Sequence, residues 1–254
     1  MKINEIFPNP TVKQVIFQIR YPNLFFIENR IGDFQIKIMT EFPDSSFFVK
    51  RNMMVVDTGR DEKIEELSKQ IGIEPTKKVW QFKSKNGTML NVMNDSLDIS
   101  SGSHKTYNMG DGETFRSIIK LVVDSFLEIT QIPMIERIGL RYIDECPLPT
   151  KNNKTFKSYY NSAFSTQRFD LETVDLMDLK TTVTKKEKFL NYGERLMKIN
   201  GEYKLILDFD GFATSIESKT YIEITDSLHD MILKEYEDTI KKPVIEYMRR
   251  SGGS

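Results

Sequence analysis

The sequence predicts an α+β fold in which a β-α-β-β-β-α unit occurs twice. Two β-type runs, 15–21 and 137–143, carry nearly the same letters, and each contains an arginine followed directly by a tyrosine. Each run is followed by a similar series of helical and strand-like segments. We therefore expect a duplicated unit that forms an antiparallel sheet, with the long helices packed on one face.

The first half is predicted from hydrophobic spacing and turn signals. Apolar residues recur every three or four positions over 24–42 and again from Phe115 to Leu127, which indicates amphipathic helices, and Pro43 ends the first of them. Asn86-Gly87 is a strong hairpin signal. The expected order is a strand at 12–21, a helix at 24–42, a strand at 46–57, a surface helix at 61–71 and two hairpin arms at 77–85 and 88–99.

The second half repeats this order. The expected elements are a strand at 134–146, a short aromatic helix at 156–164, strands at 171–185, 187–200 and 202–216, and a final helix that reaches Pro243. Asn200-Gly201 joins the last two strands, and Thr225 or Asp226 is a good N-cap for the final helix. We assign 1–112 to the first repeat, 113–250 to a linking helix and the second repeat within one compact unit, and 251–254 to a flexible tail.

Composition limits the partners of this chain of 254 residues. It has 36 Lys and Arg against 37 Asp and Glu, for a net charge of −1, so no overall field attracts polyanions. The single cysteine, Cys146, excludes an internal disulfide and fits a reducing cytoplasm. No apolar run approaches the length of a membrane span. We expect a cytoplasmic protein without a membrane partner.

Arginines on the two echoed strands are the first candidate site. Side chains alternate along a strand, so Arg137 and Arg141 share a face with Gly139 between them, and Arg20 is the arginine of the other echoed run. These guanidinium groups could fix the sheet by pairing with acids, or they could hold a carboxylate or phosphate ligand. We favour ion pairing.

Two aspartates on one later strand are the matching acids. Asp208 and Asp210 are two residues apart, so both carboxylates lie on the same face. Pairing with Arg137 or Arg141 is their simplest use. Together with Asp144 and Glu223 they could instead hold Mg²⁺ for phosphodiester chemistry, although no Lys or His stands at a recognisable spacing. We predict no metal and no cofactor, with Mg²⁺ at Asp208 and Asp210 as the alternative.

Basic clusters are the candidates for contact with nucleic acid or a partner protein. Such small clusters are most often solvated element ends that favour the helix C-terminal dipole. The histidines match no zinc or triad spacing, and we expect His229 to be solvated. The candidates are Lys185, Lys186, Lys188, Lys241, Lys242, Arg249 and Arg250.

The chain resembles an uncharacterised, sporadically distributed prokaryotic family of about this length. The resemblance rests on Asn9-Pro10 and the strand that follows, on the Arg-x-Gly-Leu-Arg-Tyr motif that begins at Arg137, on Leu207 to Asp210, and on the closing helix. Asp144 stands where the family has asparagine, and the tryptophan common after the central loop tyrosine is missing near Tyr107. The resemblance implies an accessory role in mobile or defence loci, including CRISPR neighbourhoods, and no defined reaction.

Three functions follow as hypotheses. The first is a non-catalytic accessory or adaptor protein of a defence system, a homodimer that binds an effector protein, with DNA left open as a further partner. The second is a Mg²⁺-dependent nuclease or phosphodiesterase that uses Asp208 and Asp210. The third is an anion or nucleotide sensor in which Arg20 and Arg141 grip the ligand.

Overall fold

The computed structural model describes residues 2–51, 76–110 and 112–250. The predicted surface helix at 61–71, the end of the strand predicted at 46–57 and the tail at 251–254 lie outside these residues. The strands are β1 (Val12–Arg20), β2 (Asp44–Arg51), β3 (Thr76–Lys83), β4 (Met89–Val92), β5 (Ser96–Ser101), β6 (Met134–Pro147), β7 (Met177–Lys185), β8 (Lys188–Ile199) and β9 (Glu202–Glu217). The helices are α1 (Ile27–Ile38), α3 (Phe115–Thr130), α4 (Asn153–Tyr159), α5 (Tyr221–Thr239) and α6 (Lys242–Arg249), with 3-10 turns η1 (Leu171–Thr173) and η2 (Ser218–Thr220).

The described strands form one nine-stranded sheet in the order β2-β3-β4-β5-β1-β6-β9-β8-β7. Neighbouring strands are antiparallel throughout, as an α+β fold with hairpin connections requires. The two echoed strands, β1 and β6, are direct neighbours near the centre, with Arg20 opposite Arg137 and Ile16 opposite Arg141.

The first half departs from the predicted order, because the arm expected at 88–99 is two strands. Met93 N–H donates to the Ser96 carbonyl, at 2.8 Å, and closes a tight turn between β4 and β5. The turn contains Asn94 and Asp95 and no Gly or Pro, and the apolar alternation changes phase across it, from Leu90 and Val92 to Leu97 and Ile99. The second half keeps the expected order of β6, α4, β7, β8, β9 and α5.

One helix boundary and one strand boundary also differ from prediction. α5 begins at Tyr221, a turn before Thr225 and Asp226, because η2 leads directly into it. The stretch at 171–176 is a 3-10 turn and loop, and β7 starts only at Met177. Asn200 and Gly201 both have positive φ, of 51° and 86°, which is the backbone of a type I′ hairpin.

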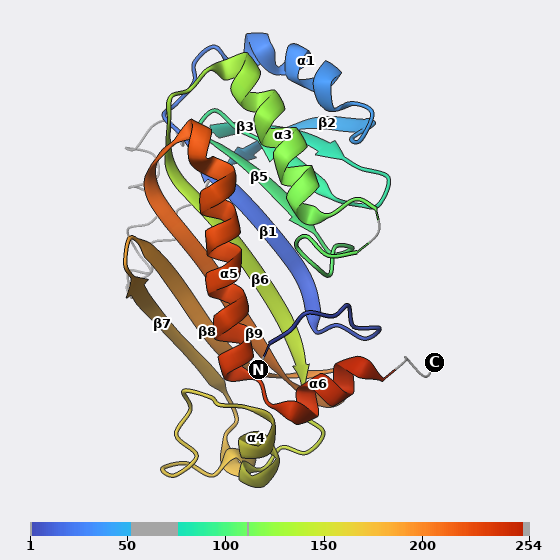
Figure 1. Cartoon of the computed structure of the whole chain (residues 1–254), viewed down its shortest axis with the longest axis vertical. Helices are drawn as coiled ribbons and strands as arrows, with labels where there is room; N and C mark the ends of the chain where they lie inside the picture. The colour runs from blue at the N-terminus through green and yellow to red at the C-terminus, as the bar shows by residue number, and fades with distance from the viewer. Residues whose placement is uncertain (1, 52–75, 111, 251–254) are drawn as a thin grey trace, which may run out of the picture.

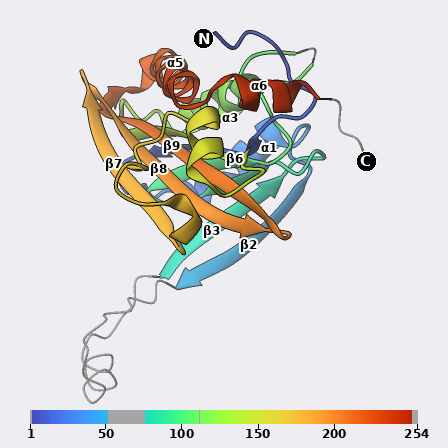
Figure 2. The same ribbon diagram turned by 90° about the horizontal axis from the view of Figure 1, so that it is seen from below.

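The helices α3 and α5 lie across one face of the sheet (Figure 1; Figure 2 shows the molecule after a 90° turn). Beneath them, side chains that alternate along the strands are buried, including Phe17 of β1, Leu140 of β6 and Phe209 of β9. A fully buried side chain of this kind contributes about 1.5–3 kcal/mol to stability. We call this the helix face of the sheet, and the other the open face.

α3 shows why its sequence folds as predicted. Thr114 caps its first turn by accepting from Ser117 N–H, and the Ser117 hydroxyl accepts from Thr114 N–H in return. Its broad apolar side is buried, with Phe126 in edge-on contact with Phe34 of α1. None of the described helices has both the length and the apolar composition needed to cross a bilayer.

Candidate functional site

Polar side chains from all nine strands form a row across the open face of the sheet, which we call the polar band. In the eight strands other than β2 each member belongs to the set that alternates with the buried residues, and Ser46 of β2 is directly opposite Gln81 of β3, so the band faces away from the helices. Its members in sheet order are Ser46, Gln81, Asn91, Asp98, Gln18, Arg137, Asp210, Asn191 and Thr182.

The first-half part of the band is a chain of side-chain hydrogen bonds. Gln81 Nε2 donates to Asn91 Oδ1 at 2.9 Å, and Asn91 Nδ2 donates to Asp98 Oδ2 at 2.8 Å. Ser46 Oγ lies 3.5 Å from Gln81 Oε1 at the β2 end. Asp98 is paired in register with Gln18 of β1, which carries the row to the centre of the sheet.

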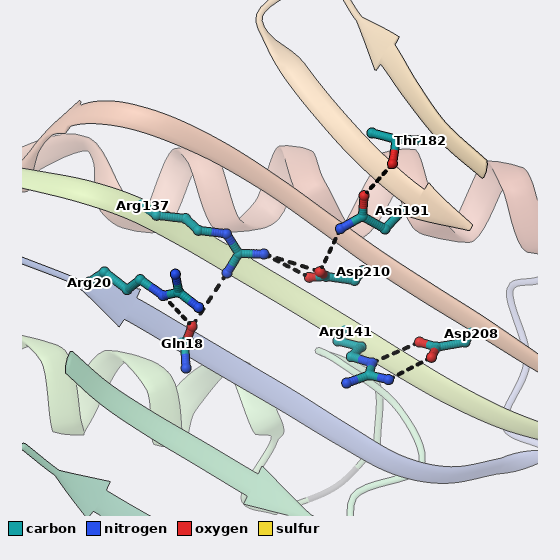
Figure 3. Close-up of polar contacts among 8 residues, drawn as sticks. All are labelled: Gln18, Arg20, Arg137, Arg141, Thr182, Asn191, Asp208 and Asp210. Atoms are coloured by element: carbon teal, nitrogen blue, oxygen red, sulfur yellow. Dashed lines mark hydrogen bonds and ion pairs between the residues drawn. The ribbon is translucent and has the colours of Figure 1, made fainter. Parts of the chain in front are cut away.

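The second-half part of the band centres on Asp210 (Figure 3). Arg137 Nη2 lies 3.1 Å from both carboxylate oxygens, and Asn191 Nδ2 donates to Oδ2 at 3.0 Å. Thr182 donates to Asn191, and Arg137 Nη1 reaches Gln18 Oε1 at 3.5 Å. A Cβ on Gly139 would lie 2.6 Å from Arg137 Nη1, so glycine there lets the guanidinium lie flat along its own strand.

Arg141 and Asp208 form a second ion pair beside the band (Figure 3). Nε donates to Oδ1 at 2.7 Å and Nη2 to Oδ2 at 2.6 Å, the two-pronged geometry that suits guanidinium and carboxylate. The hydrogen bonds that Arg141 donates to Asp208 raise the pKa of Arg141. Arg20 differs, because its Nε donates to the Gln18 amide oxygen at 3.0 Å. The arginines and aspartates singled out in the sequence thus meet on one surface.

An aromatic pair adjoins the band. Phe189 of β8 and Phe212 of β9 stack with ring centroids 5.0 Å apart. The Arg137 Cζ lies 4.5 Å from the centroid of Phe212, which is within the range of a cation–π interaction. Arg137 therefore contacts a carboxylate, an amide and an aromatic ring at once, and its position is strongly defined.

The basic clusters lie apart from the polar band. Lys185 is ion-paired with Glu235 and Lys188 donates to Ser227, so both are tied to α5, while Lys186 occupies the β7–β8 turn with φ of 58°. At α6, Lys241 donates to the Lys157 carbonyl at 2.6 Å and Lys242 lies 3.5 Å from Glu246. Arg249 pairs with Glu5 at 2.5 Å, and Arg250 is the C-cap.

The four acids considered for Mg²⁺ do not converge. Asp144 lies on the helix face and is only 2% exposed, whereas Asp208 and Asp210 are on the open face and are bonded to arginines. Glu223 is in the first turn of α5. Within residues 2–51, 76–110 and 112–250, no three His, Cys, Asp or Glu side chains are grouped as metal ligands. The sequence could not show that Asp144 of β6 and the two aspartates of β9 lie on opposite faces of the sheet, because the pairing register of these strands was unknown.

A cavity on the helix face was not foreseen. It lies between the N-terminal segment, the loop at 105–109, α5 and the end of β6, and has a volume of about 120 Å³. His229, expected in solvent, instead lines it and stacks on Tyr107 with centroids 4.4 Å apart. Burial lowers the pKa of His229. The sequence feature that could have indicated this cavity is Asp144, a carboxylate two residues after Tyr142 on an otherwise apolar strand face.

Comparison with family models, with curated proteins and with solved structures gave no match.

Proposed function

We propose that this chain is a non-catalytic, cytoplasmic and homodimeric adaptor of a prokaryotic defence system of the CRISPR-associated kind, and that it binds an effector protein through its open sheet face. The polar band carries this proposal. Its side chains are already held by hydrogen bonds to one another, so they lose little further conformational entropy when a partner binds. The defence setting follows from the resemblance of the Arg137–Tyr142 motif, and it is part of the proposal.

A protein partner fits the charge of this face better than nucleic acid does. Arg137 and Arg141 are each neutralised by an aspartate, so these pairs present alternating charge to a partner. Nucleic-acid binding instead depends on uncompensated cations that displace counterions from phosphates. DNA stays a second candidate because the Phe189–Phe212 stack beside Arg137 would suit an unpaired base.

The effector proposal is tested by reversing one exposed charge on the open face. Arg20→Glu is suitable because Arg20 is exposed and its bond is to the neutral Gln18 side chain, so folding should be preserved. Lys234→Glu, on the exposed side of α5, makes the same charge change on the other face. Co-purification with the products of neighbouring genes should be lost for Arg20→Glu and kept for Lys234→Glu. Equal retention by both variants would place the interface elsewhere.

The homodimer and DNA parts have their own measurements. Light scattering on the purified chain should give twice the monomer mass of 29.7 kDa. Fluorescence anisotropy with a labelled single-stranded oligonucleotide should show binding that weakens steeply with salt if phosphates are contacted. A monomer and a flat anisotropy titration would remove these two parts and leave the adaptor proposal standing.

The nuclease and anion-sensor alternatives both require the observed ion pairs to open. Mg²⁺ at Asp208 and Asp210 would have to displace Arg141 and Arg137, and an anion at Arg141 would have to displace Asp208. Mg²⁺-dependent cleavage of DNA or RNA that disappears in the Asp208→Asn, Asp210→Asn double variant would establish the nuclease. A thermal-shift response to nucleotides that Arg141→Gln removes would establish the sensor.

We also propose that the two halves arose by duplication. In support, β1 and β6 pair antiparallel with Gln18 opposite Gly139, and each of these residues stands two positions before the Arg-Tyr pair of its own strand, so the two motifs are arranged symmetrically about this contact. The last strand of each half, β5 or β9, pairs with the first strand of its own half. Main-chain superposition of β1 and β5 on β6 and β9 tests this, and a different register in the two pairs would contradict it.

A further inference from the structure

The cavity on the helix face combines apolar walls with a small polar floor. Ile3, Ile6 and Phe7 of the N-terminal segment and Met109 of the loop are among its apolar lining. Its polar lining includes Asp144, Tyr142, Thr11 and Tyr236, each of which has a side-chain oxygen. A concave apolar site with a few convergent polar groups is the usual form of a small-molecule site.

Tyr142 supplies the first observation that points to a ligand. Its side chain is 7% exposed, and its hydroxyl is one of three buried side-chain polar atoms without a hydrogen-bond partner in the described part of the chain. A buried hydroxyl left unpaired costs about 1–3 kcal/mol. Because this hydroxyl belongs to a residue that lines the cavity, a ligand in the cavity can complete its hydrogen bonding.

Asp144 supplies the second observation. Thr11 Oγ1 donates to Asp144 Oδ1 at 2.8 Å and lies 2.6 Å from the Tyr236 hydroxyl. None of the ion pairs among the described residues includes Asp144. The cation facing it is Lys105, whose Nζ donates to the carbonyls of Val12 at 3.0 Å and Gly102 at 2.6 Å. The carboxyl is therefore buried without a close counter-charge.

The size of the cavity sets the size of the ligand. A dry protein cavity of about 150 Å³ accepts benzene, and this cavity measures about 120 Å³. This volume is somewhat below the one that accepts benzene, so one six-membered ring or a short alkyl chain is the upper limit for the apolar body of a ligand. Two non-helical segments, the N-terminal residues and the loop at 105–109, form much of the wall.

We propose that this cavity binds a small molecule with an apolar body of about one ring and a protonated amine, which donates to the Asp144 carboxylate and the Tyr142 hydroxyl. An amine supplies the counter-charge that Asp144 lacks and a donor for the unpaired hydroxyl. A carboxylate ligand would be repelled by Asp144, and an alcohol would leave its charge uncompensated. This inference does not depend on the open-face adaptor proposal, because the two surfaces lie on opposite faces of the sheet.

The titration of Asp144 gives the proposal a further signature. Burial raises the pKa of Asp144 to about 7; the charge of Asp208 adds to this rise, while Thr11 and Lys105 oppose it. Near pH 7 the carboxyl is about half protonated, and a bound cation holds it ionised. Binding of the amine should then release roughly half a proton per ligand at pH 7.

Three probes with the same ring test the proposal: benzylamine, benzyl alcohol and benzoate. With the whole chain at pH 8, benzylamine should raise the thermal midpoint and bind by calorimetry, and the other two should bind about tenfold more weakly or not at all. Asp144→Asn should weaken benzylamine binding by a similar factor. Asp178→Asn, the same change at the β7 edge, should leave it unchanged.

Two further measurements keep the test decisive if Asp144→Asn folds poorly. Leu233→Trp, on a lining position of α5, should fill the cavity and abolish benzylamine binding. Calorimetry of the wild type at pH 7 in buffers of different ionisation enthalpy should reveal the released proton. Equal binding of all three probes, no binding of benzylamine, no proton release, or equal loss in Asp178→Asn would overturn the proposal.

Discussion

The two strands that share the Arg-Tyr pair, β1 and β6, lie side by side yet give the same side chains different surroundings. The Tyr21 hydroxyl lies 2.9 Å from the carbonyls of Met93 and of Ser96, both in the β4–β5 turn. The Tyr142 hydroxyl has no partner among the described residues and belongs to the cavity lining. Arg20 bonds a neutral amide, whereas Arg141 bonds a carboxylate at two points.

This difference shows which level of structure decides each property. The strand sets the direction of the side chains, so both tyrosines face the helices and both arginines face away. The neighbouring elements set the partner. A tight turn closes over Tyr21, while a loop and the N-terminal segment leave space near Tyr142. The β1 surroundings are those of a structural residue, and the β6 surroundings are those of a binding site.

The largest expected effect separating the two strands comes from Asp144, the buried acid of β6. Its pKa is raised by burial to about 7, so the folded state binds a proton more tightly than the unfolded chain does. The stabilisation by protonated Asp144 is fully present below the unfolded pKa near 4. It decreases as the pH rises from there and is lost once the pH has passed the folded pKa of about 7. In urea titrations the free energy of unfolding of the wild type should fall by roughly 2–4 kcal/mol between pH 4 and 8 because of Asp144. Asp144→Asn should not show this fall.

Asp226 provides a control of opposite sign. The hydrogen bond from Arg116 lowers the pKa of Asp226, so its contribution is present at neutral pH and is lost on acidification. Asp226→Asn should therefore reduce stability at neutral pH and make the acid limb shallower. If Asp144→Asn and the wild type have parallel stability curves from pH 4 to 8, Asp144 is not buried as described.

The two tyrosines should respond differently to loss of the hydroxyl. Tyr21→Phe leaves the carbonyls of Met93 and Ser96 without this donor and should destabilise the protein by about 1–2 kcal/mol. Tyr142→Phe removes an unpaired buried hydroxyl and should be neutral or slightly stabilising. The midpoints of urea unfolding measure both. Equal destabilisation by the two changes would show that Tyr142 has a partner.

The smallest expected difference is between the arginines. Arg141→Ala removes a two-pronged pair that is partly exposed, with side chains 42% and 33% accessible, and should cost about 0.5–1 kcal/mol that decreases with salt. Arg20→Ala should change stability by less than about 0.3 kcal/mol, because its bond is to an exposed neutral amide. A double-mutant cycle with Asp208→Ala measures the coupling. A coupling energy near zero would show that the ion pair of Arg141 adds as little to stability as the hydrogen bond of Arg20.

Much of the fold could be predicted because it depends on local signals. The β6 strand, the α3 helix and the Asn200-Gly201 hairpin appear where spacing and turn residues placed them. The β4–β5 turn was missed because its signals, Asn94 and Asp95, are weaker than the Gly and Pro that mark the other turns. The early start of α5 was missed because η2 leads into it, which no capping residue announces.

The candidate site also has a part that local signals predict and a part that they do not. Alternation along a strand placed Arg137 with Arg141, and Asp208 with Asp210, on shared faces. The order of the strands then brought β6 beside β9 and made the ion pairs, and no feature of either strand alone specifies that contact. The polar band needed all nine strands in register, so its extent could not be foreseen.

By itself the sequence determined most element types, the antiparallel α+β class and which side chains of one strand share a face. These follow from periodicity and turn chemistry, which act over a few residues. Only the tertiary structure decided that Asp144 and Tyr142 lie at a cavity while Asp208 and Asp210 lie on the opposite surface. Burial and partnership depend on residues more than a hundred positions apart, such as Thr11 and Asp144, and no local pattern encodes such a distance.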